Sequence, residues 1–251
     1  MFNDCINLTI APELPATTLA IYCYNDMFKG CINLITAPEL PATTLANYCY
    51  QNMFYGCTNL ITAPELPATT LGDFCYDCMF ARCISLTTAP QLPATTLTNY
   101  CYSSMFKDCK NLTTAPSILP ATTLTDNCYS YIFDGCSSLT TAPQLPATKL
   151  ADYCYQYMFQ DCVNLTVIPQ LPATTLTSYC YRYMFKGCTK IKLSKSQTGE
   201  YQTEYRIPTS GTGSITGSSS LWYVFEGTGG TFTGSPTTDT IYYLSTSNTV
   251  V

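Results

Sequence analysis

The chain has 251 residues and a net charge of −5; 46% of its residues are hydrophobic and only 11% are charged. It is long enough to bury a substantial core, and neutral Thr and Tyr side chains replace the usual surface charges. No basic run could neutralise phosphates, which argues against nucleic acid and anionic membranes as partners. The longest apolar runs are a few residues, so the sequence predicts neither membrane insertion nor a signal peptide within these residues.

A unit of 26 residues repeats along most of the chain. One interval has 27 residues, where Ser117 to Pro120 replaces the usual spacing. The unit is marked by an apolar pair that recurs at Met1-Phe2, Met27-Phe28, Met53-Phe54, Met79-Phe80, Met105-Phe106, Ile132-Phe133, Met158-Phe159 and Met184-Phe185. Periods of this length are typical of stacked repeats, so residues 1–193 are predicted to form a repeat solenoid of seven full repeats plus a partial one.

Each repeat contains one predicted strand. A Leu opens a short alternating stretch in every unit, and a Pro four residues later has no N–H to donate to a sheet. The strand should therefore be about four residues long and pair in parallel with its neighbours. The Leu column is Leu8, Leu34, Leu60, Leu86, Leu112, Leu139 and Leu165.

The rest of the unit returns along the other side of the coil. Leu19, Tyr22-Cys23-Tyr24 and Met27-Phe28 supply apolar groups at spacings of three to five residues. Such spacings fit an irregular or short helical segment packed onto the strands. The predicted fold class is therefore an α/β-type repeat solenoid, with one short parallel strand per 26-residue turn.

The composition changes after Leu193. Residues 194–251 are rich in Ser, Thr and Gly and are predicted to form a small β-rich C-terminal cap over the open sheet edge. At the other end the chain begins inside a repeat, so either Met1 is a fragment boundary or a partner chain or missing domain covers the N-terminal edge. The expected core anchors of the cap are Tyr201, Tyr205, Trp222, Tyr223, Phe225, Tyr242 and Tyr243.

The repeat carries a family resemblance. The pattern Cys-x-Asn-Leu-x-x-Ala-x-x-Leu-Pro from Cys57 to Pro67, preceded by Met-Phe-x-Gly-Cys, resembles the BspA-like (Treponema-type) leucine-rich repeat. The resemblance covers about residues 1–193, although the family has Ile where this chain mostly has Ala and only Ile168 keeps it. Similar Thr- and Tyr-rich chains are those of gut bacteria and their phages. The resemblance implies surface adhesion or recognition, and it supplies no catalytic residue.

Fifteen of the 16 cysteines fall in two columns of the repeat. A column of small buried hydrophobes is the favoured interpretation of this cysteine ladder. Disulfides between adjacent coils are the alternative, because stacked Cα atoms about 5 Å apart permit them. The chain has no His, and its one Cys-x-x-Cys spacing, from Cys75 to Cys78, is interpreted as a column cysteine beside a lone exposed thiol, so no metal site and no cofactor are predicted.

Two sets of residues are candidate ligand contacts. Without His there is no Ser-His or Cys-His pair, so the chain is predicted not to be an enzyme and to have no catalytic residues. The change from Glu to Gln along the first column suits a solvated ladder or a ligand-binding face better than a catalytic dyad. The second set lies in the variable return segment, where Tyr gives rigid contact area. The candidates are Glu13, Glu39, Glu65, Gln91, Gln144, Gln170, Tyr131, Tyr157 and Tyr183.

Two functions follow from these observations. The first is a non-enzymatic binding or adhesion module at the cell surface or outside the cell, which presents its repeat surface to a glycan or to a host or receptor protein. The alternative is a phage virion structural or tail-fibre (receptor-binding) component, for which reduced cysteines and a missing signal peptide would both be natural.

Overall fold

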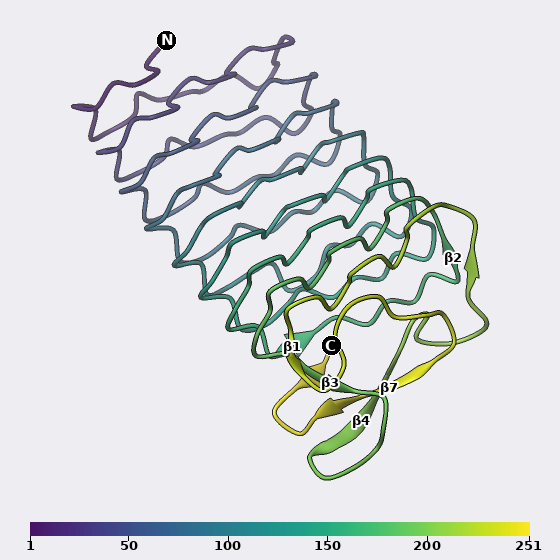
Figure 1. Cartoon of the computed structure of the whole chain (residues 1–251). Helices are drawn as coiled ribbons and strands as arrows, with labels where there is room; N and C mark the ends of the chain where they lie inside the picture. The colour runs from purple at the N-terminus through teal and green to yellow at the C-terminus, as the bar shows by residue number, and fades with distance from the viewer.

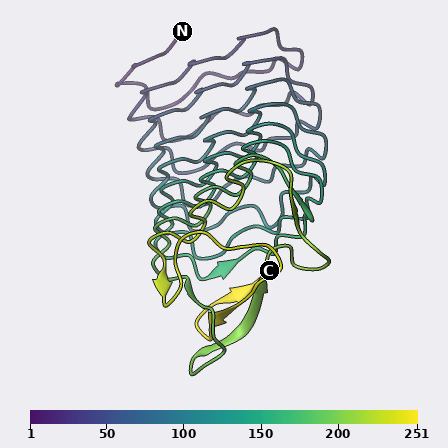
Figure 2. The ribbon, with the colours of Figure 1, turned by 45° about the vertical axis from the view of Figure 1, so that its right-hand side comes forward.

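A computed structural model describes all residues from 1 to 251. The chain winds in successive coils that stack along one axis, from the N-terminal coil to the C-terminal cap (Figure 1). Figure 2 shows the same stack turned by 45°, with the cap strands at its lower end. We call the part of each coil that begins with the repeated Leu and ends at the first Pro the strand side. We call the part from about the Tyr-Cys-Tyr triplet to the next Cys the return segment.

Pairing on the strand side is shorter than the sequence predicts. Single parallel bridges join Thr36 to Thr62 and Thr88 to Thr114. A second line of bridges, which joins Thr44 to Thr70, lies outside the strand side, beyond the second Pro of each coil. Instead of four residues, only one or two pair in each coil, because a proline without an N–H follows two residues after the bridge. Strands of two residues form only beside the cap, where β1 (Val167–Ile168) and β2 (Thr175–Leu176) lie.

The return segments are held together by an alternating pattern of backbone hydrogen bonds. The N–H of Tyr50 donates to the Cys75 carbonyl of the next coil at 3.0 Å, whereas the next N–H, of Gln51, donates back to Tyr48 at 3.3 Å. The pattern then repeats, with Asn52 donating to Asp77 of the next coil at 2.9 Å. Every second amide therefore closes a tight turn within its coil, and the others join the coils.

This pattern requires a left-handed backbone at every fourth residue. In one coil Tyr48, Asn52 and Gly56 have φ angles of 59°, 52° and 73°. A helix cannot contain such residues, because L-amino acids in a helix need negative φ. Of the two forms expected for this segment, the irregular one is present and the short helix is not, so the α/β class is corrected: the leucine-rich repeat contains β-bridges and turns but no helix.

Aromatic residues occupy six of the seven positions in one left-handed column, from Tyr22 to Tyr179, and the last three positions of another, Tyr131, Tyr157 and Tyr183. A Tyr in this conformation costs about 1 kcal/mol, and ring stacking between coils offsets a similar amount. Ring centroids of Tyr48 and Phe74 are 4.9 Å apart, and those of Phe74 and Tyr100 are 4.4 Å apart. Aromatic stacking along the surface thus supports the strained backbone that the turns need.

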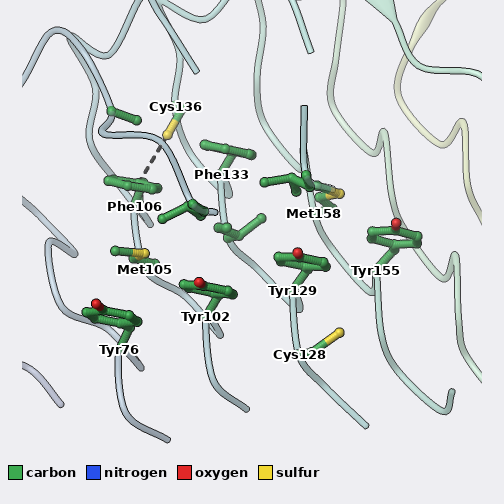
Figure 3. Packing of buried hydrophobic residues seen from close by; sticks show 14 of the residues in the cluster. Tyr76, Tyr102, Met105, Phe106, Cys128, Tyr129, Phe133, Cys136, Tyr155 and Met158 are labelled. Atoms are coloured by element: carbon green, nitrogen blue, oxygen red, sulfur yellow. Dashed lines mark hydrogen bonds between the residues drawn. The ribbon is translucent and has the colours of Figure 1, made fainter. Parts of the chain in front are cut away.

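The core is a set of parallel columns between the two sides. Sixty-nine buried apolar residues form one cluster, and Figure 3 shows the stacked rings of Tyr76, Tyr102, Tyr129 and Tyr155 in one of its columns. A Phe column beside it has centroid spacings of 5.5 to 5.7 Å along most of its length. Stacking makes the core continuous although no single coil could bury its own apolar side.

Thirteen of the 15 column cysteines are buried, as predicted, the exceptions being Cys5 and Cys23 at the N-terminal end, and all 16 cysteines are free. The thiol of Cys136 donates to the carbonyl of Phe106 in the preceding coil at 3.1 Å (Figure 3). The same contact recurs in this column, for example from Cys83 to Phe54 at 3.1 Å. A small apolar side chain with a weak donor is what this position needs, and Cys provides both.

The C-terminal segment folds onto the last coil. A four-stranded sheet has the order β4 (Tyr201–Arg206), β7 (Ile241–Ser245), β3 (Lys192–Ser194), β6 (Gly229–Gly230). Two further strands, β5 (Ser214–Ile215) and β8 (Thr249–Val250), pair in parallel with β2 and β1.

The carbonyl groups of the cap also accept hydrogen bonds from the N–H groups of the last return segment. The N–H groups of Tyr181 and Phe185 donate to Ser220 and Val224 at 3.0 and 2.9 Å. The N–H of Phe225 in turn donates to Gly234 at 2.8 Å, which ends the series. The amides of the last return segment that face the cap are thus satisfied within the protein.

The expected aromatic anchors of the cap divide into two groups. Tyr205, Phe225 and Tyr242 are buried, as predicted. Tyr201 and Tyr243 are only partly buried. Trp222 is not a core residue, since 39% of it is exposed, and Tyr223 is only partly buried. Both lie in a segment that stacks on the last return segment as a further coil would, so their side chains take the outward-facing positions of that coil.

The third left-handed column gives a direct test of the backbone requirement. Gly56 has a φ of 73°, and an added Cβ would meet nothing within 4 Å. The change Gly56→Ala should therefore lower the free energy of unfolding by about 1 kcal/mol through backbone strain alone. In the same column, Arg82→Gly should raise it by about 0.5 to 1 kcal/mol. Urea unfolding measures both.

Arg82→Ala is the matched control, because it removes the same contacts to Asp108 and Tyr55 but keeps the Cβ. It should be no more stable than the parent. If Arg82→Gly and Arg82→Ala unfold at the same urea concentration, left-handed backbone strain at this position does not lower the stability of the protein.

Candidate binding surfaces

The predicted Glu column lies exposed between the two proline columns. Glu13 and Glu39 line one hollow of about 540 Å³ together with Pro38. Glu39 and Glu65 line the next, of about 240 Å³. The structure thus brings neighbouring carboxylates of this column together in pairs, in the half of the stack nearest the N-terminus.

The glutamines at the C-terminal end of this column line a different hollow from the glutamates. Gln144 and Gln170 line a hollow of about 290 Å³ with the C-terminal residue Val251. Ile118, which bridges to Gln144, stands in the column between them and the exposed Gln91. The column is therefore acidic as far as Glu65, neutral at Gln91, interrupted by Ile118 and neutral again beyond it, and its role as a ligand contact stays a prediction.

The outward positions of the strand side also change along the stack. In the N-terminal half several hold exposed isoleucines, such as Ile35 and Ile61 at 48% and 54% exposure. The same positions hold Thr140 and Thr166 further along, and Lys192 in the last coil. One strip of the surface thus changes from apolar to hydroxyl-bearing to basic.

The three candidate tyrosines form one stack on the return segments. Ring centroids are 4.6 Å apart between Tyr131 and Tyr157, and 5.0 Å apart between Tyr157 and Tyr183. Burial, with smaller effects from Tyr157 and Asp134, raises the pKa of Tyr131 to about 12. The rings cover one another's faces, so the stack presents ring edges and hydroxyl groups to the solvent.

Arg182 joins this stack to the cap. Its guanidinium lies 5.0 Å from the ring centroid of Tyr183 and 4.8 Å from that of Trp222. Tyr223 extends the stack beyond Tyr183, at 5.6 Å. Arg182 makes no ion pair, and its buried Nε has no hydrogen-bond partner in the protein. We call Tyr131, Tyr157, Arg182, Tyr183, Trp222 and Tyr223 the arginine–tyrosine cluster.

Sequence reasoning found only part of this cluster. It singled out the three tyrosines, but it assigned Trp222 and Tyr223 to the core and gave Arg182 no role. Arg182 does stand out in its column, where Asn25, Gln51 and other uncharged or acidic groups precede it. That change of charge beside a tyrosine stack is the signal that could have found it.

The column that ends at Arg182 is linked by side-chain hydrogen bonds. Asn25 Nδ2 donates to Gln51 Oε1 at 3.0 Å, and Gln51 Nε2 donates to Asp77 Oδ2 at 3.0 Å. Burial raises the pKa of Asp77, and its hydrogen bonds with Gln51, Cys78 and Ser103 only partly oppose this. A carboxylate in this position is thus tolerated and not favoured.

The pKa values of the buried thiols are also raised. Burial raises the pKa of Cys49, Cys57 and Cys101 to about 12. Cys23 is the one exposed thiol, and Cys5 and Cys78 are partly buried.

No group of three or more Cys, Asp or Glu side chains is arranged to hold a metal ion. None of the segments forms a helix long and apolar enough to span a membrane.

Stacked coils with a repeated Leu and a short parallel bridge define a leucine-rich repeat protein. Residues 1–140 and 64–192 match the family of BspA type leucine rich repeat regions, in 6 copies, and the chain belongs to this family. Repeats of this family in general form protein-binding or adhesion modules.

One solved structure with a similar chain is a leucine-rich repeat protein from Bacteroides ovatus. It has 18% sequence identity and a TM-score of 0.39, over 80% of this chain and 48% of that chain. The chain therefore spans about half the length of that protein. No curated protein matches the chain.

The raised thiol pKa values predict low reactivity. At pH 8 a thiol with a pKa of about 12 is about 0.01% thiolate, so the buried columns should resist alkylation while the protein is folded. We expect rapid labelling of Cys23, slower labelling of Cys5 and Cys78, and labelling of all 16 thiols only after denaturation. Intact mass spectrometry counts the labels.

Two outcomes would contradict this arrangement. Rapid labelling of the folded protein at many sites would mean that the coils open readily. Fewer than 16 labels after denaturation without reductant would reveal disulfides between coils.

The raised pKa of Asp77 predicts a pH-dependent loss of stability. Protonated Asp77 favours the folded state, so its contribution is fully present below its ordinary pKa of 3.8 and is lost as the pH rises through the raised value. At pH 7, Asp77→Asn should therefore raise the melting temperature by about 2 to 4 °C. The gain should vanish as the pH falls towards 4.

Asp73→Asn is the control, because Asn47 and Asn99 already occupy the same column in neighbouring coils. It should shift the melting temperature little at either pH. An equal gain from both variants would point to net charge and away from burial of Asp77.

Proposed function

We propose that this chain is a non-enzymatic adhesion module that binds a partner protein through the arginine–tyrosine cluster. The observation that carries the proposal is the composition of the cluster: Tyr, Trp and Arg are the residues most enriched at the energetic centres of protein interfaces. The proposed location is the cell surface or the extracellular space, where modules of this family would meet host or receptor proteins.

The geometry of the tyrosines supports a protein partner over a sugar at this site. A sugar ring that stacks on an aromatic side chain needs a free ring face. Tyr157 has its faces covered by Tyr131 and Tyr183, with centroids 4.6 and 5.0 Å away. Ring edges and hydroxyls remain, and these suit the mixed polar and apolar contacts of protein interfaces.

The state of Arg182 indicates the chemistry of the partner. Its charge is held against aromatic rings and has no acidic partner in this protein. A carboxylate delivered by another protein, with apolar groups around it to cover Trp222, would complete both contacts. The expected partner surface is therefore an Asp or Glu side chain within an apolar surround.

Biolayer interferometry with the full chain on the sensor, against a panel of purified matrix and serum proteins, tests the proposal. We expect at least one panel protein to bind, and Arg182→Ala and Trp222→Ala each to weaken that binding by about tenfold or more. Binding should also weaken at higher salt, because a charge pair contributes to it.

Arg82→Ala is the matched control, since Arg82 is an arginine on a return segment far from the cap and outside the cluster. It should leave binding unchanged. Binding that survives the loss of both Arg182 and Trp222 would place the contact elsewhere, and a panel with no binding protein would remove the support for an adhesion module.

A further inference from the structure

A second site, different in chemistry from the cluster, lies on the strand side beside the cap. It is an open hollow of about 530 Å³ without any apolar side chain in its lining. Two lysines, Lys190 and Lys192, line it from the last coil. The other lining residues carry hydroxyl or amide groups: Ser138, Thr140, Asn164, Thr166 and Ser247.

The two lysines differ in residue type from the equivalent positions of the preceding repeats. Lys190 occupies the position of Ser138 and Asn164 in the two preceding coils, and Lys192 that of Thr140 and Thr166. Nothing in the stacking of the coils requires a change to lysine, since both side chains point away from the core columns and are not among the buried residues. The seventh lining residue, Ser247, comes from the cap and has no counterpart in the repeat.

A buried side chain of the cap holds these parts in place. Asn248 is 1% exposed. Its Oδ1 accepts a hydrogen bond from the N–H of Lys192 at 2.9 Å, and its Nδ2 donates to the carbonyls of Lys190 at 3.1 Å and Thr166 at 3.2 Å. One side chain thus fixes the two coils and the cap turn that form the hollow, which preorganises it for a ligand.

The hollow has a local positive charge on an acidic protein. Lys190 makes no ion pair, whereas Lys192 Nζ lies 3.6 Å from Glu200 Oε2. That carboxylate oxygen also accepts a hydrogen bond from Ser245 at 2.7 Å. The net charge of the chain is −5, so the positive charge is local to this hollow, and its one uncompensated lysine suits a single carboxylate of a ligand.

The lining narrows the class of ligand. A nucleotide base or an apolar peptide side chain would find no ring or aliphatic surface in the hollow. Five hydroxyl and amide side chains offer both donors and acceptors, which match the hydroxyl groups of a sugar. A lysine ammonium adds a charge-assisted hydrogen bond to a carboxylate.

We propose that this hollow binds an acidic saccharide, a sugar chain that bears carboxylates. Lys190 contacts the carboxylate, Lys192 and Ser247 flank it, and the hydroxyl and amide groups of the two preceding coils bind neighbouring sugar hydroxyls. This site is distinct from the arginine–tyrosine cluster and acts whether or not that cluster binds a protein.

Isothermal titration of the full chain tests the proposal with short oligomers of galacturonate, guluronate and glucuronate as probes. Galactotriose is the matched neutral probe for the galacturonate trimer, because it has a CH₂OH group in place of each carboxylate. We expect at least one acidic oligomer to bind, about tenfold or more tighter than its neutral counterpart, and binding to weaken as salt is raised.

The variants assign the binding to the hollow. Lys190→Gln should weaken binding about tenfold, and the further change Lys192→Gln should weaken it more. Lys149→Gln removes the same charge from an exposed lysine outside the hollow and should change nothing. Because these side chains are exposed, melting curves of all variants should overlay, which separates loss of binding from loss of folding.

Three outcomes would overturn the proposal: no acidic oligomer binds, the neutral trimer binds as tightly as the acidic one, or Lys190→Gln binds like the parent. Each leaves the protein-binding test unaffected, since that test depends on Arg182 and Trp222. Saccharide binding that is unchanged in Arg182→Ala, and lost in Lys190→Gln, would support two separate sites.

Discussion

The whole structure depends on one backbone constraint, a left-handed residue at every fourth position of the return segment. It lets alternate amides close tight turns within a coil while the others bond to the next coil, so the return side needs no helix. It also places side chains in pairs, two inward and two outward, as with Met53 and Phe54 followed by Tyr55 and Gly56. Because each coil is hydrogen-bonded to the next through the same positions, equivalent residues lie directly above one another. The aromatic stacks, the thiol contacts and the Asn-Gln-Asp column all follow from that alignment.

The same constraint gives the stack a direction. Every backbone hydrogen bond between coils of the return segment runs from an N–H to a carbonyl of the following coil, so the two ends are chemically different. At the cap end, amides such as those of Tyr181 and Phe185 find carbonyls in the segment around Trp222. At the N-terminal end, the carbonyls of Ile21, Cys23 and Asn25 accept no hydrogen bond from the protein. A segment that covers this edge would have to supply donors, as a further coil of the same kind does; that a partner chain or domain covers it stays a prediction.

The sequence predicted the repeat, its 26-residue period, the family and the buried columns, because these depend on which residues recur and not on backbone angles. It did not predict the absence of a helix. Apolar pairs recur at a period of four in the return segment, where a helix needs 3.6, and Asn52 and Gly56 are residues that tolerate positive φ. Tyr48 and Tyr131 concealed that signal, since bulky residues rarely adopt this conformation without a stack to support them. The arginine–tyrosine cluster was only half predicted for another reason. Tyr183 and Tyr223 are 40 residues apart, so an alignment of the repeats at a period of 26 residues does not place them at equivalent positions.

Specific recognition in such a stack is expected where the columns change. A residue in the middle of a column packs between equivalent residues on both sides, and a substitution must suit both neighbours as well as any ligand. Beside the cap this restriction is relaxed, because non-repeating residues replace one neighbour. Both sites argued for here lie at that junction: Arg182 meets Trp222, and Lys190 lies beside Ser247. The uniform coils before them act as a rigid support, and the cap both closes the hydrogen-bond series and supplies the side chains that make the last two coils chemically unlike the rest.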